Sequence, residues 1–361
     1  MPRSIFRVLV LGTVIAAATL NTDPANALPR YSAQYGQNCV LCHVNPTGGG
    51  MRSEYATQYL IPEEIAARGW EEGEMQNMSP RISPNITLGV DLRSLLYQQE
   101  GGAGSSFAMQ GDLYINLELS QKFGAYVEQG LNGSGEVFGI ARADLLDSYL
   151  KAGRFIPDYG WRFADHQMFN RRYLTDGGGS ESPAGLYGQG FEVGVSPGGF
   201  SASAALLGGS QRNGDNYSAR ALYQTNLGDI NVGLGGSVLR RQLGQEARRA
   251  AGGLWYLAYG PVTWLGEIDE TKQDGQLGNM VSQELAFQVK KGYDLRLTYN
   301  FQDPDRAQKN GSRQRYGAGV SAMPRPYFGF SLMANYWDLE PGSAIDDEDR
   351  LEGELMVHFF Y

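Results

Sequence analysis

Cysteine and histidine are scarce in this sequence, which has two cysteines and three histidines among 361 residues. Long apolar runs are absent too: after residue 27 no stretch of 18 apolar residues occurs, which argues against a membrane-spanning helix there. Charged residues make up 19%, the net charge is −9, and the sequence carries no nucleic-acid-binding signature. With 49 glycines and 21 tyrosines, this composition is not typical of an ordinary cytosolic enzyme.

Both cysteines lie in one motif, Cys39-Val40-Leu41-Cys42-His43. A C-x-x-C-H sequence is the attachment site of a c-type haem, because two thiols one helical turn apart can add to the two vinyl groups of one porphyrin. His43 would then ligate the iron, and no thiol would remain for a disulfide. The alternatives are a redox dithiol or half of a zinc site, but zinc needs two further ligands and the other histidines, His166 and His358, lie far along the chain.

The first 27 residues have the pattern of a secretory signal peptide. Arg3 and Arg7 form a positive start, residues 8–20 are apolar, and Ala25-Asn26-Ala27 is a small-x-small cleavage site. The apolar stretch is too short to span a membrane, although a retained anchor is the alternative. Cleavage after residue 27 would remove two arginines and one aspartate, which changes the net charge from −9 to −10.

From residue 81 to residue 361 apolar and polar residues alternate, which predicts β-strands with one apolar and one polar face. A soluble all-β protein would alternate as well, and it is the alternative to a transmembrane antiparallel β-barrel. Three features favour the barrel. Runs recur every 10 to 25 residues, the chain ends on an apolar face with aromatic Tyr361, and aromatics cluster near strand ends. The cluster comprises Trp255, Tyr256, Tyr259, Trp264, Tyr327, Phe328, Tyr336 and Trp337.

The alternation predicts sixteen strands, an even number as single-chain bacterial barrels require. The pair 136–146 and 148–157 has a poorly signalled turn, and merging it with another weak strand would give fourteen. The predicted strands are 85–98, 105–120, 123–133, 136–146, 148–157, 186–196, 198–208, 216–226, 229–241, 248–259, 262–272, 281–291, 293–303, 313–323, 326–338 and 350–361.

Tight turns and long loops should alternate between these strands, with every tight turn at the end that carries the C-terminus. The predicted long loops are 209–215, 273–279, 303–312 and 339–349; the last holds Glu340 and Asp346 to Asp349 and could gather cations. Segment 158–185, which contains His166, is expected either to fold inward as a constriction or to remain an external loop. Charged residues on the polar faces predict a hydrated lumen: Asp91, Arg93, Glu118, Glu267, Asp269, Glu284, Asp294 and Arg296.

Residues 28–80 form a separate, small α-helical segment around the haem motif. Short helices are predicted over 52–60 and 62–68, the second starting at Pro62 and ending at Gly69. About 50 residues bury little by themselves, so the haem and the barrel wall must complete the core. A sixth iron ligand from this segment would be Met51, Met75 or Met78, with Met51 slightly preferred; for each, packing against the porphyrin or the barrel is the alternative.

The residues around the haem motif resemble the entry segment of the fused monohaem cytochrome–porins, a family that includes outer-membrane iron oxidases. The resemblance rests on residues 27–31, 36–43 and 55–59 together with Pro46, about 35 residues in all. It implies one haem c held by Cys39, Cys42 and His43, followed by a porin of about sixteen strands. Two departures, Gly48-Gly49-Gly50 as an insertion and Ala56-Thr57 in place of Gly-Arg, indicate a relative with another electron donor or acceptor.

These features predict an outer-membrane, porin-like electron-transfer protein of a Gram-negative bacterium. The apolar band of a barrel is roughly 25 Å tall, too thick for a periplasmic haem to reach an external donor. Either the haem segment lies within the barrel, or a small donor such as Fe(II) diffuses through the pore. The expected partners are membrane lipid and a periplasmic cytochrome or similar carrier. The alternatives are a passive porin with a structural haem plug and an enzyme that uses an open haem iron, for instance on peroxide.

Overall fold

The structure is a computed structural model that describes residues 29–36, 38–70, 79–102, 104–131, 135–162, 187–208, 216–243, 246–273, 275–308, 311–341 and 349–361. Five sequence predictions lie outside the described residues: the signal peptide over 1–27, the ligand candidates Met75 and Met78, His166 with its neighbours, the loop 209–215, and most of the acidic loop.

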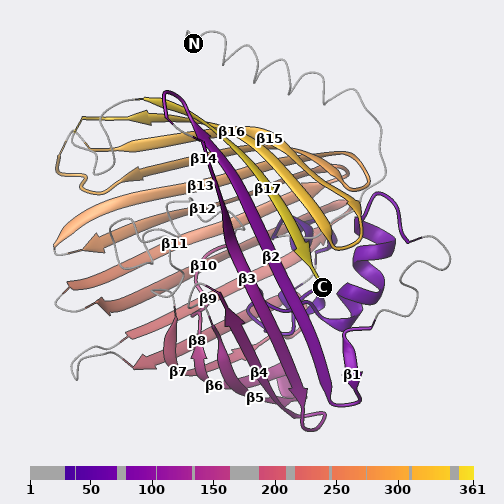
Figure 1. The fold of residues 1–361 in the computed structure, drawn as a ribbon. Helices are drawn as coiled ribbons and strands as arrows, with labels where there is room; N and C mark the ends of the chain where they lie inside the picture. The colour runs from indigo at the N-terminus through magenta and orange to yellow at the C-terminus, as the bar shows by residue number, and fades with distance from the viewer. Residues whose placement is uncertain are drawn as a thin grey trace.

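The described residues form a closed antiparallel barrel of sixteen strands, β2 to β17 (Figure 1). Closure comes from β17, whose residues Glu352 to Phe360 pair with Gln99 to Asp91 of β2. A short strand, β1 (Arg81–Ser83), pairs with the start of β2. The barrel strands are β2 (Ile86–Gln99), β3 (Ser105–Glu118), β4 (Phe123–Gly130), β5 (Val137–Ala143), β6 (Ser148–Phe155), β7 (Gly188–Val195), β8 (Phe200–Gly208), β9 (Asn216–Leu227), β10 (Ile230–Leu243), β11 (Glu246–Tyr259), β12 (Val262–Gln273), β13 (Gln276–Lys290), β14 (Tyr293–Asp303), β15 (Arg313–Arg325), β16 (Phe328–Leu339) and β17 (Arg350–Phe360).

The sixteen predicted strands are confirmed, including the doubtful pair β5 and β6. Their connection is a short 3-10 turn, η3 (Leu145–Asp147), in which Leu146 and Asp147 have φ values of 57° and 46°. Non-glycine residues seldom adopt positive φ, so no residue pattern marks this turn. The predicted long loop 273–279 is wrong: β13 begins at Gln276, and Gly275, with φ at 89°, makes a tight turn instead.

The outer surface of the barrel is apolar, whereas its interior carries the polar residues. On β2, for example, Leu88, Leu92 and Leu96 are exposed while Thr87 and Asp91 are buried. Of the predicted aromatic girdle, Tyr259, Trp264 and Phe328 are exposed on the outer wall. Tyr256, Tyr327 and Trp337 are buried instead, so those three are not part of a girdle.

Residues 29–70, here called the lumen segment, pack inside the barrel at the end that carries the C-terminus (Figure 1). The helix α2 (Pro29–Tyr35) contacts β10, β11 and β12. A 3-10 turn, η1 (Cys39–Leu41), follows, and a π-helical segment, η2 (Ala56–Ile65), packs against Tyr327 and Phe360 at the barrel end. The fold therefore agrees better with the prediction that this segment lies within the barrel than with a segment that lies outside the barrel on the periplasmic side.

The helix predictions for this segment were partly wrong. Pro62 does not start a second helix but lies inside η2, which ends with the Ala66 N–H bonded to Ile61 O. Pro62 has no N–H to donate to Thr57 O, and Tyr327 Oη donates to that carbonyl instead. Helix α2 was not predicted, because seven residues give too short a pattern. Among the described residues, no helix has the length and apolar character needed to cross a membrane.

Candidate haem centre

The C-x-x-C-H motif forms a single helical turn. The backbone N–H groups of Cys42 and His43 both donate to the carbonyl of Cys39, at 3.1 and 3.0 Å. Asn38 precedes the turn in an extended conformation, and its carbonyl accepts from Leu41 N at 3.1 Å. The turn therefore has the spacing that attachment of two thiols to one porphyrin requires.

The imidazole of His43 lies in an enclosed environment. Burial, aided by the positive charges of Arg52 and Arg162, lowers the pKa of His43 to about 3, so the ring is neutral at physiological pH. Its Nδ1 atom is buried and has no hydrogen-bond partner among the described residues, whereas the backbone of Gly49 and of Gly50 hydrogen-bonds to the ring. A neutral imidazole with an unpartnered nitrogen is the form that ligates a metal.

The thiols do not have the character of a reactive redox pair. Burial raises the pKa of Cys42 to about 11 and also raises the pKa of Cys39. Catalytic dithiols instead have lowered thiol pKa values in electropositive surroundings. The dithiol alternative is therefore disfavoured by the environment of the motif.

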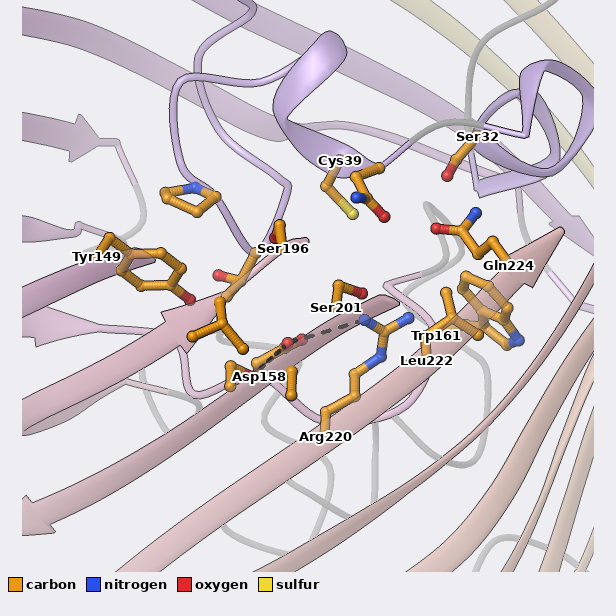
Figure 2. Close-up of a pocket in the computed structure, with 16 residues that line it drawn as sticks. Ser32, Cys39, Tyr149, Asp158, Trp161, Ser196, Ser201, Arg220, Leu222 and Gln224 are labelled. Atoms are coloured by element: carbon orange, nitrogen blue, oxygen red, sulfur yellow. Dashed lines mark hydrogen bonds and ion pairs between the residues drawn. The ribbon is translucent and has the colours of Figure 1, made fainter. Parts of the chain in front are cut away.

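A small pocket, partly open to solvent, is lined by Cys39, Asp158, Trp161 and Arg220 (Figure 2). The Cys39 sulfur points into it, opposite Asp158 and Arg220. Ser203 Oγ donates to Asp158 at 2.8 Å, Arg220 lies 3.8 Å from the same carboxylate, and the Arg220 guanidinium stacks 5.2 Å from the Trp161 ring centroid. The cavity itself, about 30 Å³, has room for one or two water molecules, and Cys42 and His43 are not among its lining residues.

The three glycines that follow the motif have a structural role. Gly48, Gly49 and Gly50 all have positive φ, at 80°, 76° and 60°. A Cβ on Gly48 would lie 3.3 Å from the Cys39 sulfur, and one on Gly50 would lie 2.3 Å from Tyr126 Oη, which is closer than atoms can approach. The apparent insertion is thus a loop that only glycine can form so close to the thiol and the wall.

Met51 packs against the barrel wall. It is 1% exposed, belongs to a cluster with Tyr114 and Tyr126, and a Cβ on Gly89 would lie 3.1 Å from its Cγ. Its backbone N–H donates to Tyr126 Oη at 3.0 Å. To act as a sixth ligand, the side chain would have to leave this cluster, so packing is the role that these contacts favour.

The barrel also brings His358 into the lumen, although the sequence places it far from the motif. Its Nε2 lies 2.9 Å from Asp91 Oδ1 and 3.3 Å from Arg93 Nε, and Arg52 lies 3.8 Å from the same Asp91 carboxylate. His358 Nε2 is therefore already engaged in a charged network. Within the described ranges, no group of three or more His, Cys, Asp or Glu side chains is arranged to hold a metal ion.

Charged contacts that the sequence did not reveal fix the lumen segment to the wall. Arg30 Nη1 donates to Glu284 at 2.8 Å and its Nε lies 3.5 Å from Asp294. On the other side, Asn45 donates to Glu136 at 3.0 Å and accepts from Lys151 at 3.3 Å. These partners lie more than 90 residues away in the sequence, so only the closed barrel brings them together.

The start of the long loop after β6 folds into the lumen, as one of the two alternatives predicts. Trp161 N–H donates to Glu267 at 2.7 Å, Tyr159 Oη donates to Asp269 at 2.6 Å, and Arg162 donates to Ile156 O at 2.7 Å and to Thr47 Oγ1 at 3.4 Å. The prediction of a hydrated lumen therefore needs correction. Five of its acidic residues are buried: Asp91, Glu267, Asp269, Glu284 and Asp294.

Substitution of Arg30 by methionine is expected to loosen the lumen segment. Removing Arg30 leaves buried Asp294 without its nearest cation and leaves Glu284 with Arg296 alone, and breaking a buried ion pair costs up to about 3–5 kcal/mol. Arg30 is 2% exposed, so solvent screens the interaction little. Limited proteolysis of the detergent-solubilised protein should cut residues 29–70 much faster in the variant.

The matched control is Arg81→Met, which removes a half-exposed ion pair to Glu54. Exposed pairs contribute about 0–1 kcal/mol, so the cutting rate of this variant should stay close to that of the wild type. Equal rates in both variants would show that Arg30 does not anchor the segment.

The residues of the motif fit a c-type haem. They supply two thiols on one helical turn and a neutral imidazole whose Nδ1 has no hydrogen-bond partner among the described residues. Cys39, Cys42 and His43 would hold the group, while Trp161 and Arg220 would line its surroundings.

Comparison with known proteins places the fold among outer-membrane porins. No family model matches the sequence, and no curated protein matches it. The structure is similar to an anion-selective porin from Comamonas acidovorans, with 11% identity, a TM-score of 0.59, and coverage of 76% of this chain and 99% of that one. It is also similar to OmpT of Vibrio cholerae, with 13% identity, a TM-score of 0.57, and coverage of 78% of this chain and 100% of that one. OprB of Pseudomonas putida is similar as well, with 7% identity, a TM-score of 0.57, and coverage of 77% and 94%. At these identities the likeness shows the fold alone.

Proposed function

We propose that this chain is an outer-membrane barrel that carries one covalently bound c-type haem inside its lumen and transfers single electrons across the membrane. The observation that carries the proposal is the mounting of a C-x-x-C-H turn inside a closed sixteen-stranded barrel. The apolar outer wall supports a membrane location, because a soluble barrel would not expose so many large apolar side chains along its strands.

In this role, the described residues would hold the haem in place and limit its contact with water. A bound c-type haem supplies a one-electron couple. Cys39 and Cys42 fix its position, and the neutral His43 ring supplies a nitrogen to the iron. Arg30 and Asn45 hold the segment at two sides of the wall, and the inward loop at Trp161 restricts water from the loop side.

A haem held within the lumen would lie closer to an external donor than a haem in the periplasm. Within the lumen segment, η2 lies at the barrel end with the tight turns, where Thr57 accepts from Tyr327, and Asn45 contacts Glu136 just before β5. An external donor such as Fe(II) and a periplasmic carrier could then reach the same centre from opposite sides. The alternative, a passive porin with a structural haem plug, fits less well, because residues 29–70 and 156–162 occupy the lumen.

A redox titration of the purified protein tests the proposal. The haem absorbance should change reversibly by one electron per chain, and both Fe(II) and a periplasmic-type cytochrome should drive the change. A haem that keeps one redox state at all accessible potentials would favour the structural plug. A five-coordinate spectrum with turnover of peroxide would favour an enzyme.

The reaction with Fe(II) should depend on ionic strength. If acidic residues draw the donor toward the lumen, Fe(II) should reduce the haem faster than an anionic reductant of similar size and potential. The gap should narrow as salt shortens the screening length to about 10 Å at 0.1 M. Stopped-flow rates at several salt concentrations measure this, and equal rates for both reductants throughout would remove the support for a cationic donor.

A further inference from the structure

We propose that Arg220 binds a carboxylate of the haem, so that the barrel wall holds the porphyrin at a point beyond the two thioethers. The proposal deepens the proposed function and rests on it, because Cys39 and Cys42 would bring the porphyrin to this place. Three features of the structure support it: Arg220 has hydrogen-bond donors without acceptors, other arginines are already engaged, and Arg220 faces the pocket that Cys39 also faces.

Arg220 lies on β9 and makes no hydrogen bond with any described residue. Its side chain is 9% exposed, and its Nε is buried without a partner. The closest carboxylate among those residues is Asp158, whose Oδ2 lies 3.8 Å from Nη1, too far for a hydrogen bond. A guanidinium has five N–H donors, and buried polar groups are normally hydrogen-bonded. Arg220 therefore has donors for an acceptor that the described part of the chain does not supply.

Other arginines of the lumen differ in this respect. Arg30 lies 2.8 Å from a Glu284 oxygen, and Arg350 lies 2.9 Å from a Glu352 oxygen. Each of these guanidinium groups thus has a carboxylate at hydrogen-bond distance. Arg220 lacks such a partner, although burial makes an unfilled donor costly.

Near the haem motif, Arg162 and Arg52 are engaged as well. Arg162 donates to Gly48 O at 2.5 Å, and Arg52 donates to Gly50 O at 2.6 Å. Both arginines therefore hold the glycine loop that follows the motif, and binding of another acceptor would compete with that role. Arg220 can bind a new acceptor without giving up a hydrogen bond.

Arg220 faces the pocket into which the Cys39 sulfur points (Figure 2). Burial raises the pKa of the Cys39 thiol, and the positive charge of Arg220 opposes that rise, as expected of groups that lie close together. The pocket has room for one or two water molecules, so a carboxylate could enter it but a porphyrin ring could not. A porphyrin attached at Cys39 would therefore reach Arg220 through a carboxylate side chain.

The surroundings of Arg220 favour a planar anion. The Trp161 ring centroid lies 5.2 Å from the guanidinium carbon, and Asp158 lies at the Nη1 side, which leaves the Nε side for a ligand. Two parallel N–H groups of a guanidinium match the two oxygens of a carboxylate. A c-type haem carries two carboxylates, so it brings such an anion wherever it is attached. A free oxyanion such as phosphate is the other source of this chemistry.

Haemin binding to the full-length Cys39→Ser, Cys42→Ser variant tests the contact, because no thioether then holds the porphyrin. Haemin dimethyl ester is the matched ligand: it keeps the iron and the ring but has no charged carboxylate. R220Q on this background should weaken haemin binding about tenfold and ester binding less than about twofold. Absorbance titration in detergent measures both, and an equal effect of R220Q on the two ligands, or no effect on either, would overturn the proposal.

A second variant keeps the test valid if R220Q does not fold. R220K keeps the positive charge beside Asp158 but lacks the planar pair of N–H donors. It should lower the affinity for haemin about threefold and leave the affinity for the ester unchanged. Equal haemin affinities of R220K and its parent would contradict the contact. Heat-modifiable gel mobility shows which variants are folded barrels.

The haem-loaded chain gives an independent readout, the midpoint potential. A nearby positive charge favours the reduced haem, which carries one positive charge fewer. R220Q should therefore lower the potential, with about a tenfold change in the reduction equilibrium, or about 59 mV for a one-electron couple. The matched control R306Q removes an exposed arginine that pairs with Glu270, and it should change this equilibrium less than about twofold. An unchanged potential in folded R220Q would count against the proposal.

Inorganic phosphate separates the two sources of the anion. If a haem carboxylate occupies Arg220, phosphate added at constant ionic strength should leave the wild-type potential unchanged. A phosphate-dependent shift that R220Q abolishes would refute the proposal in favour of a free oxyanion.

Failure of this contact is distinguishable from failure of the proposed function. A haem that exchanges electrons normally and has the same potential in wild type and R220Q contradicts the contact alone. A wild-type chain without covalent haem contradicts the proposed function, whereas the comparison of haemin with its ester still tests Arg220.

Discussion

Replacement of both Cys39 and Cys42 by serine is expected to abolish covalent haem attachment completely while the barrel still folds. Serine cannot form a thioether with a vinyl group, and these are the two cysteines of the chain. The barrel should persist because its strands pair with one another through a continuous ladder that closes between β17 and β2. A pyridine haemochrome assay on denatured protein should give one c-type haem per wild-type chain and none per variant chain.

Met51→Leu is the matched control for this experiment. Leucine keeps the volume that fills the site against Gly89 and Tyr114, and it has no sulfur. Haem content and the oxidised and reduced spectra should match the wild type. Loss of a sulfur-ligand absorbance band in Met51→Leu would show that Met51 leaves the cluster to ligate the iron. Haem that acid–acetone extracts freely from wild-type protein would contradict covalent attachment itself.

The barrel could be predicted from the sequence because its signal is local. Alternation of polar and apolar residues is read within each strand, and turns such as Ser196-Pro197-Gly198-Gly199 carry their own glycine and proline. The exceptions have a physical cause. At the turn between β5 and β6, Leu146 has a positive φ although it is not glycine. The hairpin at Gly275 is tight, although it lies at the end of the barrel opposite the C-terminus, where long loops were predicted.

The haem motif could also be predicted, because Cys39, Cys42 and His43 are adjacent in the chain. Its surroundings could not. Trp161, Arg220 and Asp158 meet Cys39 only after the barrel closes and the loop beyond β6 turns inward. Burial also reverses the role of residues such as Glu284: the sequence suggests a hydrated carboxylate, but the structure pairs it with Arg30. Such pairs join residues that are far apart in the sequence, so no local sequence pattern predicts them.

Deletion of residues 29–78, with residues 1–28 retained, is expected to open the barrel as a pore, because residues 29–70 pack inside it. The segment contributes α2 against β10 to β12 and the motif loop against Tyr126 and Glu136, so its removal leaves the polar inner wall to water. Single-channel conductance in planar bilayers should rise roughly tenfold or more over the full chain.

The open pore should prefer cations, because Glu284 and Asp294 lose the positive charge of Arg30, and Asp91 loses that of Arg52. The control is the Cys39→Ser, Cys42→Ser variant, which keeps the segment without covalent haem and should conduct as little as the wild type. Heat-modifiable gel mobility should confirm that all three proteins are folded barrels. If the deletion variant is folded but conducts no better than the full chain, the inward loop at 156–162 seals the lumen and the N-terminal segment does not. If the cysteine variant conducts as well as the deletion, the haem itself is what holds the segment in place, and the contacts of Arg30 and Asn45 are too weak to do so alone.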